Sequence, residues 1–203
     1  MKSARSSISS QVARSIAFLF GVGLSPVAPG TLATVAAVPL VVFLATLGPL
    51  LYAAVTIVMM LAAIWLAGQV ERELGVVDPS AIVIDEVIGF IVAMAFLPME
   101  YLVLAAAFAL FRFFDIFKPP PIGWIEQRFA GGFAIVIDDV VAGLMTNVII
   151  QISLVAIGMT EVLYTLDVGA CFRIGRNTAI ALNGTFSCIV CSQSQRFVTI
   201  KSL

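Results

Sequence analysis

A long uncharged stretch early in the chain constrains the fold more than any other feature of the sequence. The 39 positions from Thr31 to Gln69 contain no charged residue, and a helix needs about 20 apolar residues to cross the hydrocarbon core of a bilayer. Gly48-Pro49 divides the stretch, which predicts helices at about 32–47 and 50–68. Across the chain 61% of residues are apolar and only 11% are charged, against roughly 25% charged in an ordinary globular domain. The sequence therefore predicts a polytopic membrane protein.

Three further apolar segments follow, and each is flanked or interrupted by charged residues. They predict helices at about 81–97, 101–117 and 140–158. The first reaches spanning length only if it carries Asp85 and Glu86 in its first turns. The second ends before the proline run 119–121, because proline lacks the backbone N–H that a helix interior needs.

The N-terminal segment 12–24 has only about 10 uninterrupted apolar residues, which is short for a span. It predicts an interfacial or re-entrant helix. A signal peptide is the alternative, but no convincing small-residue cleavage site precedes Pro26 and Pro29. We therefore expect an all-α fold, a polytopic membrane helical bundle with four to five transmembrane helices and an N-terminal interfacial or re-entrant helix.

Basic residues are distributed unevenly over the two sides that this helix order defines. The short connections at 48–49 and 98–100 contain no Lys or Arg. The other side holds Lys2, Arg5, Arg14, Arg72, Arg112, Lys118 and Arg128. Because short basic loops stay in the cytoplasm, we expect a multi-pass protein of a bacterial inner membrane whose charged side faces the cytoplasm.

The composition changes in the last quarter of the chain. Residues 160–203 hold four of the eleven basic residues and all three cysteines, without sustained periodicity. The single Cys-x-x-Cys at Cys188 and Cys191 has neither a second pair nor a histidine, which favours an incidental spacing over a thiol or metal site. We therefore divide the chain into a membrane domain, 1–158, and an atypical tail, 159–203, which we expect to be disordered or to arise from an altered reading frame.

The chain contains no histidine, and its formal net charge is −1. Without an imidazole there is no Ser-His-Asp triad, no phosphohistidine and no His-ligated zinc. A near-neutral chain also lacks the basic face with which proteins displace counterions from nucleic acid, so we expect no nucleic-acid partner. Catalysis would have to use carboxylates, amines, hydroxyls, thiols or a hard metal ion.

Ionisable residues cluster beside or within the apolar segments, where each is costly unless it is paired, hydrated or bound to a metal. Two acidic pairs share a frame of an apolar triplet, two acids and a following glycine: Asp85-Glu86 and Asp138-Asp139. A further acid, Asp115, lies three residues after Arg112, so a helix places both on one face. Acidic pairs are also typical of helix N-termini, but their repetition favours a site for a hard cation such as Mg²⁺.

Glycine-containing turns and basic residues supply candidate ligands for a phosphate group. Two turns open predicted helices, one with Pro29, Gly30 and Thr31 and the other with Gly131 and Gly132. Free N–H groups at a helix start bind anions, although each turn is by itself also an ordinary helix cap. Arg112 and Lys118 carry positive charge that can neutralise phosphate oxygens.

Several phosphatase chemistries do not fit the sequence. Histidine-based lipid phosphatases are excluded by composition. Cys-x5-Arg is absent, because Cys171 to Arg176 and Cys191 to Arg196 are each one residue too short. The acids are adjacent rather than alternate, which does not support an aspartyl-phosphate motif. Metal-assisted hydrolysis remains, in which carboxylates hold Mg²⁺, a carboxylate activates water and a basic side chain stabilises the transition state.

Four motifs stand in order along the first 158 residues. They are Ala28-Pro29-Gly30-Thr31, Ile84-Asp85-Glu86-Val87-Ile88-Gly89, the run Phe-Arg-Phe-Phe-Asp-Ile-Phe-Lys-Pro from Phe111 to Pro119, and Gly131-Gly132 through Asp138-Asp139 to Gly143. Over about residues 15–158 they resemble the successive signatures of the bacterial phosphatidylglycerophosphatase A family. One departure is Ala134, where the family pattern leads us to expect glycine.

This resemblance implies an Mg²⁺-dependent enzyme of phospholipid biosynthesis that removes the terminal phosphate of phosphatidylglycerophosphate to give phosphatidylglycerol. With the charge pattern, it leads us to expect catalytic roles for Asp85, Glu86, Asp115, Asp138 and Asp139. We expect Mg²⁺ on Asp85, Glu86, Asp138 and Asp139. We expect the phospholipid substrate at Pro29, Gly30, Thr31, Arg112, Lys118, Gly131 and Gly132. Which acid is ligand and which is base, and the oligomeric state, stay open.

Two other functions account for charged residues in a membrane protein. A small transporter would use the same carboxylates to carry protons or other cations, but the acids lie at helix ends on one side and no inverted repeat is visible. A membrane subunit without chemistry would use polar residues as interhelical contacts, which does not explain two acidic pairs beside Lys118. We therefore expect a phosphatase, with the transporter as the alternative.

Overall fold

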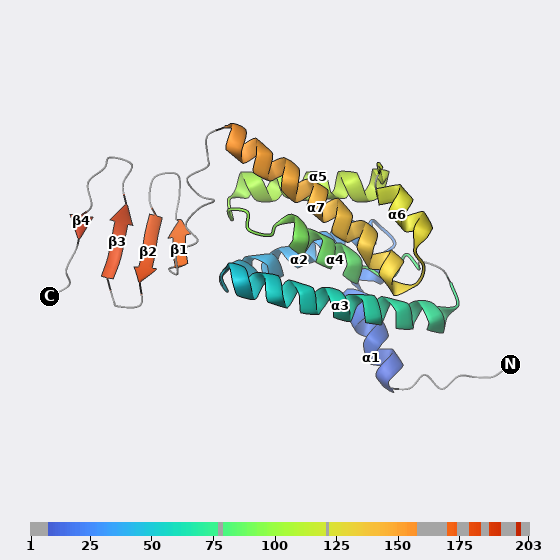
Figure 1. Ribbon diagram of the computed structural model, residues 1–203. Coiled ribbons are helices and arrows are strands. Elements are labelled where there is room, and N and C mark those ends of the chain that lie inside the picture. Colours follow the sequence, from blue (N-terminus) through green and yellow to red (C-terminus); the bar gives the residue numbers. More distant parts are fainter. Residues whose placement is uncertain are drawn as a thin grey trace. The chain divides into compact units, whose positions relative to one another are not determined.

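The computed structural model describes residues 8–76, 79–120 and 122–157 and four strands between residues 170 and 199. The chain divides into two compact units, Met1–Thr160 and Glu161–Leu203. Within the described residues, the first unit contains only helices (Figure 1). The helical class predicted for the membrane portion is therefore confirmed.

Three predicted segments form helices at nearly the predicted positions. They are α2 (Pro29–Ala45), α3 (Pro49–Leu74) and α5 (Tyr101–Phe117). α2 and α3 each begin with a proline, whose fixed φ suits the first helical position and whose missing N–H is not needed there. α5 ends where Lys118 adopts a left-handed conformation, with φ of 43°, and prolines follow. Local sequence signals account for these helix ends.

The N-terminal segment forms a helix and a short 3-10 helix, α1 (Ile8–Ala17) and η1 (Leu19–Leu24). The backbone N–H of Val83 donates a hydrogen bond of 3.0 Å to the carbonyl oxygen of Ala17. Arg14 forms an ion pair of 2.7 Å with Glu73 near the end of α3. The N-terminal helix therefore packs on later parts of the chain through Arg14 and Ala17, which lie one turn apart.

The helix that carries the first acidic pair is shorter than predicted. α4 covers Ile84–Ala93 instead of about 81–97, and its 10 residues rise about 15 Å, half of the hydrocarbon thickness. The helix alone is too short to cross the bilayer, so the predicted span at 81–97 is not confirmed. The segment stops early because Phe96 takes a positive φ of 61° and side chains of other helices satisfy the carbonyl groups at its end.

The helix that carries the second acidic pair begins earlier than predicted. α7 runs from Gly132 to Ala156, so Asp138 and Asp139 lie about two turns inside it rather than before a start near residue 140. The apolar residues after Gly132 continue the helical pattern, and Gly131 ends the preceding loop with φ of 74°. A short helix, α6 (Ile122–Arg128), precedes it and is not among the predicted segments.

Two helices of the described residues, α3 and α7, are long and apolar enough to cross a membrane. α2 is a shorter apolar helix of 17 residues. The predicted number of four to five spans is therefore not confirmed.

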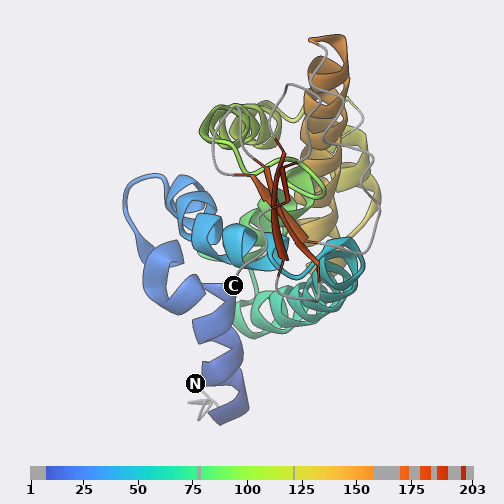
Figure 2. The same ribbon diagram turned by 90° about the vertical axis from the view of Figure 1, so that its left-hand side faces the viewer.

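α7 packs against α3, α4, α5 and α6, and Figure 2 shows it in orange beside the yellow α6. Its contact with α4 is made by two glycines. A Cβ atom on Gly143 would collide with the carbonyl oxygen of Gly89, and one on Gly89 would lie 2.7 Å from the carbonyl oxygen of Asp139. Gly89 and Gly143, like Ala93 and Asn147, are 54 positions apart in sequence. Because this offset repeats along the contact, α4 and α7 run parallel with their backbones close together.

The second unit contains an antiparallel sheet with the strand order β1-β2-β3-β4. Its strands are β1 (Ala170–Arg173), β2 (Ala179–Asn183), β3 (Ser187–Cys191) and β4 (Val198–Thr199). The all-α class therefore applies to the first unit alone, and the Ile and Val residues of these strands favour extended backbone. The expected disorder of the tail stays a prediction. Cys188 and Cys191 lie in β3, with side chains outside the described part of the structure. The altered reading frame stays a prediction.

The close contact of α4 and α7 makes Gly143 intolerant of a larger residue. We expect Gly143→Val to lower the free energy of unfolding by about 1–3 kcal/mol, because its branched side chain would meet backbone atoms that cannot rotate away. The matched control is Ala106→Val on an exposed face of α5, which should leave stability nearly unchanged. Thermal unfolding of both variants in detergent tests this, and equal melting temperatures would contradict the glycine contact.

Candidate active site

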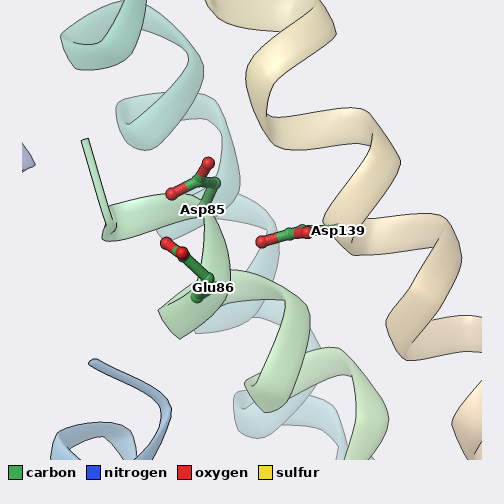
Figure 3. A group of neighbouring side chains, drawn as sticks. All are labelled: Asp85, Glu86 and Asp139. Atoms are coloured by element: carbon green, nitrogen blue, oxygen red, sulfur yellow. The ribbon is translucent and has the colours of Figure 1, made fainter. Parts of the chain in front are cut away.

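Three carboxylates lie together where the first turn of α4 meets α7. One oxygen from each of Asp85, Glu86 and Asp139 lies within 4.8 Å of the other two. Figure 3 shows the Asp139 side chain pointing from α7 towards Asp85 and Glu86 on α4. Asp139 is only 3% exposed, and the other two are half-buried. Because like charges this close repel one another strongly away from water, this three-acid cluster requires compensating positive charge or bound protons.

Each acid of the three-acid cluster has one buried oxygen without a hydrogen-bond partner. These atoms are Asp85 Oδ1, Glu86 Oε2 and Asp139 Oδ2. Buried polar atoms are paired in the great majority of cases, so three unpaired oxygens in one place indicate a missing partner. Carboxylate oxygens are the ligands that hard divalent cations prefer. The residues present therefore fit an ion of the Mg²⁺ type.

The acid of α7 that lies beside Asp85 is one residue later than the similarity of the two acidic motifs predicts. The shared frame aligns Asp85 with Asp138, whereas Asp139 is the acid that joins Asp85 in the structure. The reason is the position of the glycines, since Gly89 follows Glu86 by three residues and Gly143 follows Asp139 by four. The glycine contact aligns the helices, and the extra residue in α7 brings Asp139 into the cluster.

Asp138 lies beside the three-acid cluster and is engaged with Lys118. Its Oδ2 accepts a hydrogen bond of 2.7 Å from Lys118 Nζ, and its Oδ1 accepts one of 3.0 Å from the backbone N–H of Asp139. The left-handed backbone of Lys118 directs this side chain from the end of α5 to α7. The structure therefore brings the predicted lysine to the acids, while the predicted metal contact of Asp138 stays a prediction.

Arg112 and Asp115 form an ion pair on one face of α5, as their spacing predicts. Both side chains are largely buried, with 15% and 14% exposed, and the Nε atom of Arg112 is buried without a hydrogen-bond partner. A Cβ atom on Gly30 would lie 3.0 Å from Arg112 Nη1 and would collide with Glu86 Oε1. The start of α2 therefore lies directly against the arginine and the three-acid cluster.

The remaining predicted substrate residues lie at two helix starts. Pro29 and Thr31 are half-buried in the first turn of α2, on either side of Gly30. A Cβ atom on Gly132 would collide with the carbonyl oxygen of Ile64 and the backbone nitrogen of Gly68, so the start of α7 packs tightly on α3. Gly131 and Gly132 thus lie where α7 packs on α3, about two turns from Asp139, and their predicted contact with the substrate stays a prediction.

The sequence reasoning missed a row of polar residues that continues from the cluster along α7. Asn147 is buried and Gln151 follows it by one turn. Asp139, Gly143, Asn147 and Gln151 are spaced by four residues, which places them on one helical face. This spacing, in an otherwise apolar helix, is the signal that could have identified Asn147 as a contact residue.

Comparison with known proteins identifies the family. Residues 15–154 match the family model of phosphatidylglycerophosphatase A. The chain belongs to this family. The predicted family membership is confirmed, and with it the prediction of an enzyme that is a phosphoric monoester hydrolase. The second unit lies outside the matched residues.

Three relatives show how much of the chain this family relationship covers. The chain is 38% identical to phosphatidylglycerophosphatase A of Escherichia coli over 128 residues, which are 63% of this chain and 74% of the relative. It is 38% identical to phosphatidylglycerophosphatase A of Haemophilus influenzae over 133 residues, 64% of this chain and 82% of the relative. A Bacteroides thetaiotaomicron protein, named provisionally as a phosphatidylinositol-3-phosphatase, is 38% identical over 148 residues, 68% and 91% of the two chains. No solved structure matches the chain.

The transporter alternative gains no support from the family or from the site. The family relatives are named as phosphatases. The acids gather around one point between α4 and α7, whereas a transport path would distribute them along a passage.

The two neighbouring aspartates should respond oppositely to the same substitution in metal-free buffer. We expect Asp139→Asn to raise the free energy of unfolding by about 1 kcal/mol, or a melting temperature by about 2–4 °C, because it removes repulsion within the three-acid cluster. Asp138→Asn should lower it, because it breaks the ion pair with Lys118. Thermal unfolding in EDTA measures both, and shifts of the same sign would contradict the different surroundings of the two acids.

Proposed function

We propose that this chain hydrolyses the terminal phosphate monoester of phosphatidylglycerophosphate to give phosphatidylglycerol, with Mg²⁺ as cofactor. The observation that carries this proposal is the three-acid cluster with its unpaired oxygens, lying beside two basic side chains. The family name supports the lipid substrate, since two relatives are named for the same activity.

The metal would be held by Asp85, Glu86 and Asp139, which bring one oxygen each within 4.8 Å of the others and have one unpaired buried oxygen each. A Mg²⁺ ion bound there would act as a Lewis acid, neutralising the charge of the phosphate and orienting it for displacement. Asp138 lies next to this set and contributes through Lys118.

Arg112 and Lys118 are the phosphate-binding side chains in this proposal. Each is held by an acid, Arg112 by Asp115 and Lys118 by Asp138, so each is fixed before substrate arrives. Fixed cations stabilise the charge that develops on the transferred phosphoryl group without reorganising at that moment. Gly30 assists because a side chain at its position would occupy the space between Glu86 and Arg112.

The water that attacks phosphorus must lose a proton to a carboxylate. Asp115 and Asp138 are engaged in ion pairs, which favours an oxygen of the three-acid cluster as the acceptor. As the water oxygen bonds to phosphorus, the bond to the glycerol oxygen breaks, and that oxygen takes up the proton that the carboxylate received from water. The products are inorganic phosphate and phosphatidylglycerol.

We also propose that the protein is a multi-pass protein of a bacterial inner membrane, with four to five spans and the site facing the cytoplasm. The apolar helices α3 and α7 support insertion. Exposed apolar side chains on α3 support contact with lipid, among them Val58 at 66% and Trp65 at 60% exposed. The uneven distribution of Lys and Arg supports the orientation.

Phosphate release in detergent micelles tests the activity and the metal together. The purified full chain should release phosphate from phosphatidylglycerophosphate with Mg²⁺, and excess EDTA should abolish release. Restored release after Mg²⁺ is returned in excess is the control for irreversible damage. Release that is unchanged in EDTA would contradict the metal, and no release under any divalent cation would contradict the phosphatase.

Lys118 should matter far more than a basic residue outside the site. We expect Lys118→Gln to lower kcat/KM by about 10²–10³-fold, because it removes a fixed donor at the phosphate. Arg128→Gln is the matched control, since it removes one positive charge from an exposed side chain at the end of α6. It should stay within about twofold of the wild type, and equal losses in both variants would indicate a general effect of charge on lipid binding.

A further inference from the structure

The C-terminal end of α4 is buried, so its last carbonyl groups need hydrogen-bond partners within the protein. The last carbonyl groups of any helix have no partner within the helix. Ala93 and Met94, at the end of α4, are both 0% exposed, so water does not satisfy their backbone groups. The carbonyl oxygen of Met94 accepts a backbone hydrogen bond of 3.2 Å from the N–H of Leu97, so side chains of neighbouring helices are needed for the carbonyl groups of Ile91 and Ala93. Tyr52 on α3 supplies one of these partners, through a hydrogen bond of 2.6 Å from its hydroxyl to the carbonyl oxygen of Ile91.

Asn147 on α7 supplies two other hydrogen bonds at this end of α4. Its Nδ2 donates hydrogen bonds of 2.9 Å to the carbonyl oxygen of Ala93 and 2.8 Å to that of Ala95. Gln151 Nε2 donates a hydrogen bond of 2.7 Å to Asn147 Oδ1, which fixes the orientation of the amide. Both hydrogen bonds of the Asn147 amide are therefore directed at the C-terminal end of α4 and the turn that follows it.

The position of Asn147 relates this contact to the three-acid cluster. Asp139, Gly143 and Asn147 lie on one face of α7, and they face Asp85, Gly89 and Ala93 of α4 with one constant offset. The glycine contact in the middle brings the helices close, but it has no side chains that interlock. The two hydrogen bonds of Asn147 are the directional contacts that oppose sliding or rotation of α4 on α7.

We propose that Asn147, oriented by Gln151, is a positioning residue that sets the register of α4 on α7 and thereby places Asp85 and Glu86 opposite Asp139. This inference rests on the proposed function, because it assumes that the three-acid cluster binds a divalent cation. α4 has only 10 residues, so a displacement of its C-terminal end is carried rigidly to the acids in its first turn. Displacements of about 1 Å in a catalytic arrangement reduce rates by as much as 10²-fold.

Metal binding measured directly distinguishes this role from a general loss of folding. Mn²⁺, a hard cation visible by electron paramagnetic resonance, is titrated into the purified full chain in detergent. We expect Asn147→Leu, which keeps the side-chain size but cannot donate, to weaken Mn²⁺ binding about tenfold or more. Gln151→Met should weaken it less, because the amide loses its orientation but keeps its hydrogen bonds. Ser153→Ala, which removes an exposed hydroxyl bonded within α7, is the control and should bind as the wild type does.

Phosphate release by the same variants adds a second readout. Asn147→Leu should raise the Mg²⁺ concentration for half-maximal rate about tenfold, while the KM for lipid at saturating Mg²⁺ stays near the wild-type value. A merely structural role would instead lower the fraction of active protein without changing either constant.

The outcomes separate this inference from the proposed function. A folded Asn147→Leu variant that binds Mn²⁺ within twofold of the wild type would overturn the positioning role alone. If that variant does not fold, Gln151→Met decides, and wild-type binding by it would overturn the role. A wild-type chain that binds no Mn²⁺ would overturn the metal site and this inference together.

Discussion

The contact between two glycines, Gly89 and Gly143, is the interaction on which the rest of this site depends. Neither position has room for a Cβ atom, so the backbones of α4 and α7 lie in direct contact and share a fixed alignment. That alignment decides which acid of each pair meets the other, and it selects Asp139 rather than Asp138. A side chain at either glycine would separate the helices, and the three carboxylates would no longer lie together. The same two glycines thus determine how α4 packs on α7 and which acids lie together.

Charge compensation explains the arrangement around the cluster. The site gathers five carboxylates and two basic side chains, and the two basic residues each pair with one acid, Arg112 with Asp115 and Lys118 with Asp138. Three acids are left together, with one buried unpaired oxygen each. In an apolar surrounding, ionic groups persist only when paired, hydrated or bound to metal. The two ion pairs therefore fix the side chains that we propose bind phosphate, and the remaining acids form the set that we propose holds a cation.

Part of this structure could be predicted because its signals are local. Prolines mark the starts of α2 and α3, and the helical spacing of Arg112 and Asp115 predicts their ion pair. The length of α4 could not be predicted from hydropathy, because the segment ends where Asn147, far along the chain, satisfies its carbonyl groups. Likewise, a sequence cannot distinguish Asp138 from Asp139 without the alignment of two helices. The strands of the second unit were missed because short apolar runs fit several structures equally well.

Lys118 shows how function and folding compete for one position. It is the residue at which α5 stops, and its backbone takes a left-handed conformation that glycine adopts at no steric cost and that costs an L-residue roughly 1–2 kcal/mol. Its ion pair with Asp138 offsets part of this cost. A residue chosen for stability alone would be glycine or asparagine. The lysine at this helix end therefore lowers stability, and under the proposed function its positive charge at the phosphate is the compensating gain. Substitutions that stabilise the protein at this position should then lower its activity.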